Sequence, residues 1–288
     1  MTQSLGPRID LTMVGDWGTA NFHTILGWIA AHMRWRSAPL SKFTIKTGSA
    51  YRDGIEAVGN GDADLAITTP CHMGVRWALN GEHFYAGRAY PNLRTLGVLP
   101  QDDRLTLALR ASLGIRSFSE IRERRPALHI AMPPRANDNL CSHVIGLMFE
   151  AHGISFEDIE RWGGSFFEHE SPRVCLQAAI DGKVNAVFNE AIMLSLWTTW
   201  TQKEPVNFMP IEPAAMDRLV GHYGLRAAAI EKGRLNNDAD VPCLDWSNWA
   251  TVVRDDMPED LAYRITSVMV EERAEFEAFV HLRGPSLQ

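Results

Sequence analysis

The chain has 288 residues, of which 45% are hydrophobic and 22% are charged, and its formal net charge is -7. This size exceeds that of a usual single-core domain, so we expect two compact lobes, each with its own core. The acidic balance argues against a nucleic-acid surface, which requires clustered Lys and Arg. No apolar run approaches the ~20 residues that span a bilayer, so membrane insertion is not expected.

Residues 1–6 are polar, and residues 9–14 have the composition of a folded strand. A secretory signal instead requires a continuous apolar stretch of roughly 7 to 15 residues. We therefore expect a cytoplasmic location for the sequence as it stands, and a periplasmic or other extracytoplasmic one if a leader has been removed.

The four cysteines are scattered, with no CxxC pair and no zinc-like spacing to histidine. This pattern predicts reduced thiols and no bound metal. There is also no P-loop and no GxGxxG after a predicted strand, so no nucleotide or other cofactor is expected.

Predicted strands and helices alternate in the first part of the chain. The strands cover residues 9–14, 43–46, 65–68, 93–98 and 105–110, and the helices cover 22–34 and 51–58. The first helix has Ile25, Leu26, Ile29 and Met33 on one face, which predicts its buried side.

A second unit of the same kind follows. Its predicted strands cover residues 128–132, 186–188 and 206–210, its helices cover 140–152 and 172–180, and an acidic helix covers 258–279. The alternation predicts mainly parallel sheets covered by helices on both faces. We expect lobe 1 to comprise residues 1–103 and 208–288, and lobe 2 to comprise residues 104–207, inserted in lobe 1.

Six short motifs in this order are similar to those of TAXI-type solute receptors, a branch of the type 2 periplasmic binding proteins. They lie at residues 47–50 (TGSA), 61–67 (GDADLAI), 91–96 (PNLRTL), 114–121 (GIRSFSEI), 179–186 (AIDGKVNA) and 258–263 (PEDLAY). The resemblance implies a two-lobed α/β fold of the type 2 periplasmic-binding-protein class, with a ligand cleft between the lobes. It also implies solute capture, with transporter membrane subunits as partners if the protein is exported.

Two segments depart from the pattern of this family. Residues 15–21 (GDWGTAN) replace its Gly-rich first turn, and residues 133–138 (PPRAND) replace its Gly-Ser-Gly-Thr helix start. Several proteins that resemble this superfamily are enzymes of cyclic acids. The departures therefore leave a cytosolic lyase or decarboxylase of a cyclic or hydroxylated carboxylic acid as the alternative function.

Ligands of open α/β sheets lie beyond the carboxyl ends of the strands, where helix N-termini favour a carboxylate. The predicted ligand-binding residues are Asp16, Trp17, Thr19, Asn21, Gly48, Ser49, Ala50 and Thr69 in lobe 1, and Arg135, Asn137, Asp138, Asn189 and Glu190 in lobe 2. Gly48 and Ser49 could bind an anion or cap a helix. Arg135 could form a bidentate ion pair with a ligand carboxylate or lie solvated on the surface.

Two acidic side chains, Asp16 and Glu190, lie beside the predicted anion site. They favour a ligand that carries an amino group or hydroxyls in addition to its carboxylate, or they indicate that the protein keeps a carboxylate of its own for proton transfer. For the enzymatic alternative, the candidate catalytic residues are His23, His72, Asp16 and Glu190. No histidine pair has the spacing of a metal site. The sequence thus leaves two hypotheses, a binding protein and a lyase or decarboxylase on the same fold.

Overall fold

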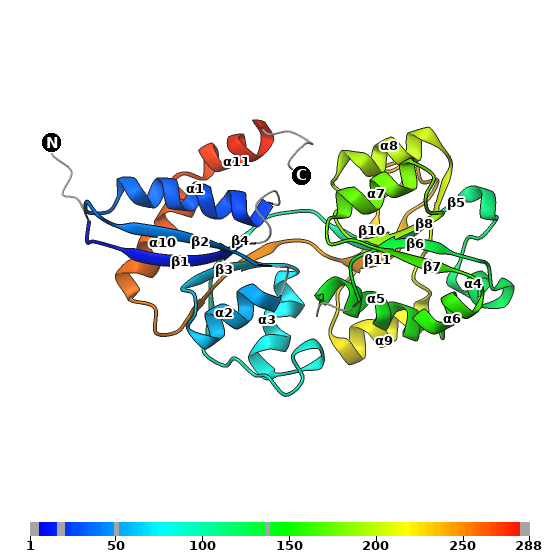
Figure 1. The fold of residues 1–288 in the computed structure, drawn as a ribbon, viewed down its shortest axis with the longest axis horizontal. Coiled ribbons are helices and arrows are strands. Elements are labelled where there is room, and N and C mark those ends of the chain that lie inside the picture. Colours follow the sequence, from blue (N-terminus) through cyan, green and yellow to red (C-terminus); the bar gives the residue numbers. More distant parts are fainter. Residues whose placement is uncertain (1–5, 16–20, 49–51, 136–138, 283–288) are drawn as a thin grey trace. The chain divides into compact units, whose positions relative to one another are not determined.

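A computed structural model of the chain describes residues 6–15, 21–48, 52–135 and 139–282. The chain forms two compact units, which are described separately (Figure 1). Unit 1 comprises Met1–Gln101 and Asn248–Gln288, and unit 2 comprises Asp102–Ser247. The chain passes from one unit to the other twice, at residues 101–102 and 247–248.

Unit 1 is built on a five-stranded sheet with the order β2-β1-β3-β12-β4. Its strands are β1 (Asp10–Gly15), β2 (Lys42–Thr47), β3 (Leu65–Thr68), β4 (Leu93–Leu99) and β12 (Trp249–Arg254). The strands β2, β1 and β3 are parallel, whereas β12 runs antiparallel to β3 and β4. The central strand β3 is buried along its whole length, as expected for a strand covered on both faces.

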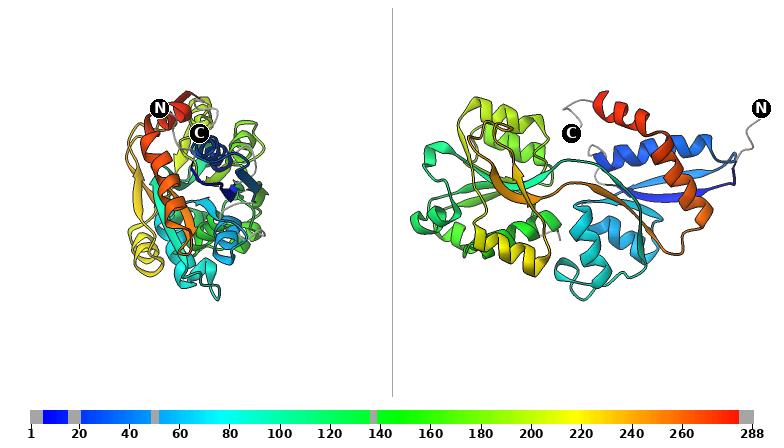
Figure 2. Two further views of the ribbon diagram at one scale, coloured as in Figure 1. Left: turned by 90° about the vertical axis from the view of Figure 1, so that its left-hand side faces the viewer. Right: turned by 180° about the vertical axis from the view of Figure 1, so that it is seen from behind.

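Helices cover both faces of this sheet, with α1 on the face opposite to α2 and α3 (Figures 1 and 2). The helices are α1 (Asn21–Trp35), α2 (Arg52–Asn60), α3 (Cys71–Asn80), α10 (Glu259–Glu271) and α11 (Arg273–Leu282), with a short 3₁₀ turn at His83–Tyr85. The predicted buried face of α1 is confirmed, since Ile25, Leu26, Ile29 and Met33 all lie in the core. The single acidic helix expected at 258–279 is instead divided into α10 and α11.

Unit 2 has a second sheet with the order β10-β11-β5-β8-β6-β7, and β9 pairs with β5 beside this path. Its strands are β5 (Arg104–Arg110), β6 (His129–Met132), β7 (Ser165–Glu168), β8 (Ala186–Asn189), β9 (Val206–Phe208), β10 (Ala227–Ile230) and β11 (Val241–Asp245). The strands β7, β6 and β8 are parallel, whereas β5 runs antiparallel to β8.

The helices of unit 2 also lie on both faces of its sheet, with α7 and α8 on one face and α5 and α9 on the other (Figure 1). They are α4 (Phe118–Arg124), α5 (Leu140–Ala151), α6 (Phe156–Arg161), α7 (Pro172–Ile180), α8 (Ser195–Lys203) and α9 (Pro213–Tyr223), with a 3₁₀ turn at Ala111–Leu113. Side chains cap the N-termini of two of these helices. Ser155 and Asp158 form a reciprocal capping box at α6, and Asn139 caps α5.

The second boundary between the units differs from the expected one. Lobe 1 was expected to resume at residue 208, but the structure keeps residues 208–247 in unit 2. The reason is the pairing of β10 with β11 and of β11 with β5, which extends the second sheet with strands that the sequence patterns did not reveal. The first boundary lies at 101–102, close to the expected 103–104.

Within the described part of the chain, no helix combines the length and the apolar character that crossing a membrane requires.

Candidate functional site

The carboxyl ends of β1, β2 and β3 meet at one edge of the unit 1 sheet, because these strands are parallel neighbours. Gly15, the last residue of β1, is paired in register with Thr47, the last residue of β2. The helices α1, α2 and α3 begin in the connections that follow these three strands. Their N-terminal N–H groups give this edge a partial positive charge suited to an anion.

Gly48 lies at this edge, and its backbone N–H donates to the carbonyl of Gly15 at 2.6 Å. A Cβ atom at Gly48 would lie 3.1 Å from the Gly15 oxygen and 3.2 Å from Cγ1 of Val14. Close packing of β1 on β2 therefore explains the glycine, and its N–H is already used within the sheet. Asp16, Trp17, Thr19, Ser49 and Ala50 lie outside the described residues.

The end of β3 carries two buried threonines. Thr68 is 1% exposed, and its Oγ1 has no hydrogen-bond partner among the described residues. Thr69 Oγ1 donates to the carbonyl of Asn248 at 3.4 Å, and the Thr69–Pro70 peptide bond is cis. A buried hydroxyl without a partner costs about 1–3 kcal/mol, so Thr68 is a candidate hydrogen-bond donor to a ligand at this edge.

The histidines of the enzymatic alternative lie in the first turns of two helices. His23 is in α1 and His72 is in α3, and both side chains are partly buried. A Cβ at Gly15 would lie 2.9 Å from the backbone nitrogen of His23, so α1 begins very close to the end of β1. Asn21 is the first residue of α1 and is also partly buried. The two histidines belong to helices that cover opposite faces of the sheet (Figure 1).

In unit 2, the corresponding edge contains the carboxyl end of β8 and the beginning of the antiparallel β5. Asn189, the last residue of β8, is paired in register with Thr106 of β5. Both side chains are buried; Asn189 interacts with the thiol of Cys175, whereas Thr106 Oγ1 has no hydrogen-bond partner among the described residues. Asn189 Oδ1 accepts from the backbone N–H of Glu190 at 2.9 Å.

The residue at the centre of this edge is Asp103, which was not among the predicted site residues. Its carboxylate accepts hydrogen bonds from the backbone N–H groups of Ala191 (2.9 Å) and Ile192 (2.8 Å), and the side chain of Glu190 lies close to it. Asp103 is only 1% exposed, and this burial raises the pKa of its carboxyl group above the ordinary value.

The turn that receives Asp103 has an unusual backbone. Ala191 has a φ of 64°, in the left-handed region that residues other than glycine rarely adopt. The two N–H groups after Glu190 point at one carboxylate, so Asp103 fills a position that could otherwise hold an external anion. The buried thiol of Cys141 in α5 lies nearby, and burial together with the charges of Glu190 and Asp103 raises its pKa well above the ordinary value.

Arg135 is bound by acidic residues of unit 2. Its Nε donates to Glu168 at 2.8 Å, its Nη1 donates to Glu160 at 3.2 Å, and its guanidinium stacks on the ring of Phe166, 4.2 Å from the centroid. This environment neutralises the charge that we expected to meet a ligand carboxylate. Asn137 and Asp138 lie outside the described residues.

The NMT1-like family model matches residues 40–283. The chain belongs to the NMT1-like family. The family match does not distinguish the predicted TAXI subtype within the family. Among curated proteins, none has significant sequence similarity to this NMT1-like chain.

Solved structures with the same fold are distant in sequence. A TctC solute-binding protein from Polaromonas has a TM-score of 0.56 and 10% identity, with 99% of this chain and 90% of that chain covered. A Xanthomonas citri protein bound to chloride has a TM-score of 0.54 and 12% identity, with 96% and 87% covered. A Bordetella bronchiseptica RB50 protein has a TM-score of 0.54 and 10% identity, with 94% and 72% covered.

These similarities establish the fold class. The NMT1-like chain has the two-lobed α/β fold of periplasmic solute-binding proteins, as predicted. None of them favours the lyase or decarboxylase alternative.

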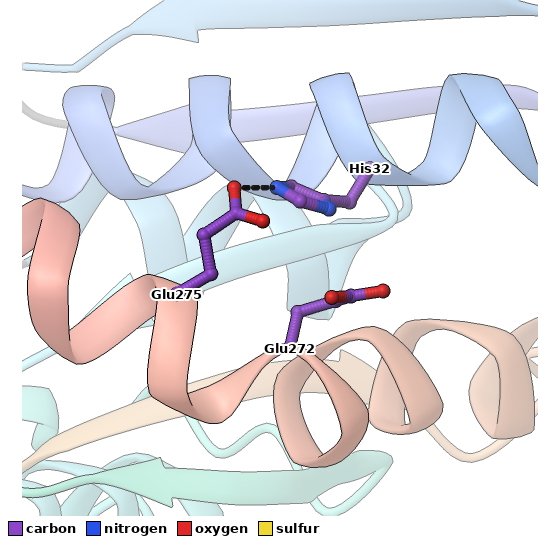
Figure 3. A group of neighbouring side chains, drawn as sticks. All are labelled: His32, Glu272 and Glu275. Carbon is purple, nitrogen blue, oxygen red and sulfur yellow. Dashed lines mark ion pairs between the residues drawn. The ribbon is translucent and has the colours of Figure 1, made fainter.

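One group of the described residues has the composition of a metal site. His32 of α1, Glu272 and Glu275 offer ligand atoms that all lie within 4.8 Å of one another (Figure 3). However, His32 Nε2 is paired with Glu275 Oε1 at 3.0 Å, and Arg36 Nη2 is paired with Glu272 Oε1 at 2.5 Å. The His32–Glu275 contact connects α1 to α11, and Arg36 already binds Glu272, so we assign no metal to this group.

Sequence patterns missed Asp103 and Thr106. Asp103 lies in the polar stretch Gln101-Asp102-Asp103 between two predicted strands, so its position at a sheet edge could have been found, just as Thr68 lies directly before the predicted Thr69. Thr106 could not, because the register that pairs it with Asn189 depends on the antiparallel course of β5.

Proposed function

We propose that this NMT1-like protein is a solute receptor that binds a small organic carboxylate, with the unit 1 edge as the carboxylate site. The main support is the buried Thr68 hydroxyl, which has no hydrogen-bond partner among the described residues and lies at an edge where three helices begin. A hydroxyl can donate to a carboxylate oxygen, and such charge-assisted bonds are stronger than neutral ones. Helix N-termini add favourable N–H groups without requiring a cationic side chain.

Unit 2 is a less suitable carboxylate site. The guanidinium of Arg135 is paired with Glu160 and Glu168, and the N–H groups of the β8–α8 turn already bind Asp103. The predicted ligand-binding roles of Asn189 and Glu190 therefore stay predictions.

The receptor subtype, its location and its protein partners are part of the same proposal. The motifs at residues 47–50, 61–67 and 179–186 support a TAXI-type receptor within the NMT1-like family. Such a receptor would act outside the cytoplasm and deliver its ligand to transporter membrane subunits. A processed leader would then precede the mature chain.

The first test is a screen of purified protein against aliphatic and aromatic mono-, di- and tricarboxylic acids. Thermal unfolding reports binding, since a ligand present at a hundred times its Kd adds about 2.7 kcal/mol to the stability. Mass spectrometry of the same mixtures detects any chemical conversion. We expect a raised Tm with unchanged acids. Conversion of an acid into a product would contradict a pure receptor, and no shift with any acid would contradict carboxylate binding.

A further inference from the structure

His152 lies where α4, α5 and α9 of unit 2 meet. It directly follows the last residue of α5 and is only 3% exposed. Its ring stacks on Phe118 of α4, with the ring centroids 3.8 Å apart and the planes inclined by 14°. Its carbonyl accepts a hydrogen bond from Nη1 of Arg122, also in α4, at 3.0 Å. The third helix reaches the same ring through Glu212, which directly precedes α9.

The two ring nitrogens of His152 have different partners. Nδ1 lies 2.7 Å from the carbonyl oxygen of Met148, and Nε2 lies 3.2 Å from the backbone nitrogen of Glu212. A carbonyl only accepts and a backbone N–H only donates, so Nδ1 carries the ring proton and Nε2 is the acceptor. A second proton on Nε2 would face the N–H of Glu212, donor against donor. This closed arrangement therefore admits only the neutral ring.

Glu212 also presents a carboxylate to this junction. Its Oε1 accepts the backbone N–H of Ser119, in the first turn of α4, at 2.8 Å. Burial raises the pKa of this carboxyl group, but the hydrogen bonds of Ser119 and the charges of His152 and Arg122 lower it below the ordinary 4.5. Glu212 therefore stays ionised at a pH where an imidazole takes up a proton, and it can pair with a charged His152.

The charged groups of α4 and α9 act on the ring in opposite directions. Burial lowers the pKa of His152 below the ordinary 6.5, and the guanidinium of Arg122 adds to this shift. The carbonyl of Met148 and the carboxylate of Glu212 oppose it. Phe118, which covers one face of the ring, is uncharged. A ring released from these contacts binds a proton near pH 6.5, so a more acidic solution favours an opened arrangement.

The helix α9 is held in unit 2 by its start and by an apolar face that packs on α5. The buried residues of this face are Ala215, Leu219 and Tyr223. One residue before Glu212, the N–H of Ile211 donates to the carbonyl of Pro242 in β11 at 2.9 Å. This bond does not involve His152, so a movement of α9 begins at Glu212.

We propose that His152 and Glu212 form a proton-operated latch, in which protonation of Nε2 releases the start of α9 and transfers the Glu212 carboxylate from Ser119 to His152. The proton comes from solvent and binds the lone pair of Nε2. The backbone N–H groups of Glu212 and Ser119 then lose their acceptors and pass to water, while the imidazolium and the carboxylate form an ion pair. The latch lies within unit 2 and does not depend on the receptor function.

Hydrogen exchange of the folded protein, read by peptide mass spectrometry between pH 7 and 5, tests the release. Dividing each rate by the intrinsic rate at the same pH gives the protection. Peptides covering residues 212–223 should lose up to tenfold in protection per pH unit below about 6.5, since opening takes up one proton. They should stay less protected than the inner strands β6 and β8, and urea below the unfolding transition should not change their protection, because a local opening exposes little surface.

Two variants separate the ring from the carboxylate. His152→Gln keeps an acceptor but binds no proton, so protection of α9 should no longer depend on pH; His222→Gln, at an exposed position of α9 itself, should behave as wild type. Glu212→Gln keeps the backbone N–H but cannot pair with the imidazolium, so protection should fall only at a lower pH. Glu123→Gln, at an exposed position of α4, should leave that pH unchanged.

A measurement on wild type keeps the latch testable if a variant fails to fold. Nitrogen-15 NMR of the imidazole at pH 7 should find the proton of His152 on Nδ1 and none on Nε2. A proton on Nε2 would overturn the latch. So would pH-independent protection of α9 in wild type, or protection of α9 equal to that of β6 and β8 at every pH, because α9 would then open only with the whole unit.

Discussion

The Asp103 carboxylate oxygen Oδ1 accepts the backbone N–H of Ile192 at 2.8 Å, which joins the start of β5 to the turn that follows β8. The same residue lies one position from the boundary between the units, and its carbonyl accepts from the N–H of Trp246 at 3.0 Å. Asp103 therefore links the β8–α8 turn to both chain segments that lead into unit 1.

Asp103→Asn should destabilise the protein by about 1–3 kcal/mol. An amide retains one acceptor oxygen, but its NH₂ group meets the second backbone N–H, so one buried donor loses its partner. Urea unfolding measures the change in free energy. Asp238→Asn, at an exposed position, is the control and should change it by less than about 0.5 kcal/mol. Equal stability of both variants would contradict this role of Asp103.

A second prediction concerns His152, which is buried against Phe118 with ring centroids 3.8 Å apart. Burial lowers its pKa, and Nε2 accepts the N–H of Glu212, so the folded state requires the neutral ring. The unfolded state takes up a proton near the ordinary pKa of 6.5, so the free energy of unfolding should decrease as the pH falls below this value.

His152→Gln should flatten this dependence between about pH 5 and 7, where a pKa difference of one unit corresponds to about 1.4 kcal/mol. Urea unfolding at several pH values provides the measurement. His222→Gln, which changes an exposed histidine, should retain the wild-type pH dependence. The same slope in the His152 variant and in wild type would contradict the assignment.

Cys71 provides a chemical probe of the unit 1 edge. It begins α3, directly after Thr68, Thr69 and Pro70, and it is the only partly exposed one of the four thiols. Iodoacetamide should therefore label Cys71 before the three buried thiols, as peptide mass spectrometry can show. A bound carboxylate should slow this labelling several-fold. Labelling at an unchanged rate under saturating ligand would argue against a ligand at this edge.

The sequence predicted the elements with regular periodicity more successfully than the sheet edges. The buried face of α1 followed from its apolar spacing, and the parallel order of β1, β2 and β3 followed from strand–helix alternation. The hairpin of β10 (AAAI) and β11 (VPCLD) has little alternation and contains a proline, so its strands were missed and the second boundary was misplaced.

The candidate site was less predictable because its chemistry depends on tertiary partners. Arg135 had the sequence context of a ligand-binding loop, but Glu160 and Glu168 come from α6 and β7 and bind it. Asp103 and Glu190 are far apart in sequence and meet only because β5 and β8 are adjacent. No local pattern carries that information.

Arg135 therefore yields a prediction about stability. Arg135→Gln should lower the free energy of unfolding by about 1–2 kcal/mol through loss of its ion pairs and its stacking on Phe166, which are only partly exposed. Affinity for a carboxylate should stay within about twofold of wild type in calorimetry. A tenfold loss of affinity with unchanged stability would restore Arg135 as a ligand-binding residue.

The most direct test of carboxylate binding at unit 1 is calorimetry of Thr68→Val with the tightest acid from the screen. Valine keeps the shape of threonine but removes the hydroxyl, for which the described part of the chain offers no hydrogen-bond partner. We predict a loss of about 1.5–3 kcal/mol in binding, or roughly tenfold to a hundredfold in Kd, while the stability of the free protein stays equal or rises. Thr201→Val, at a buried threonine whose hydroxyl donates to Thr198 in unit 2, should leave the Kd unchanged. An unchanged Kd in Thr68→Val would contradict the carboxylate site.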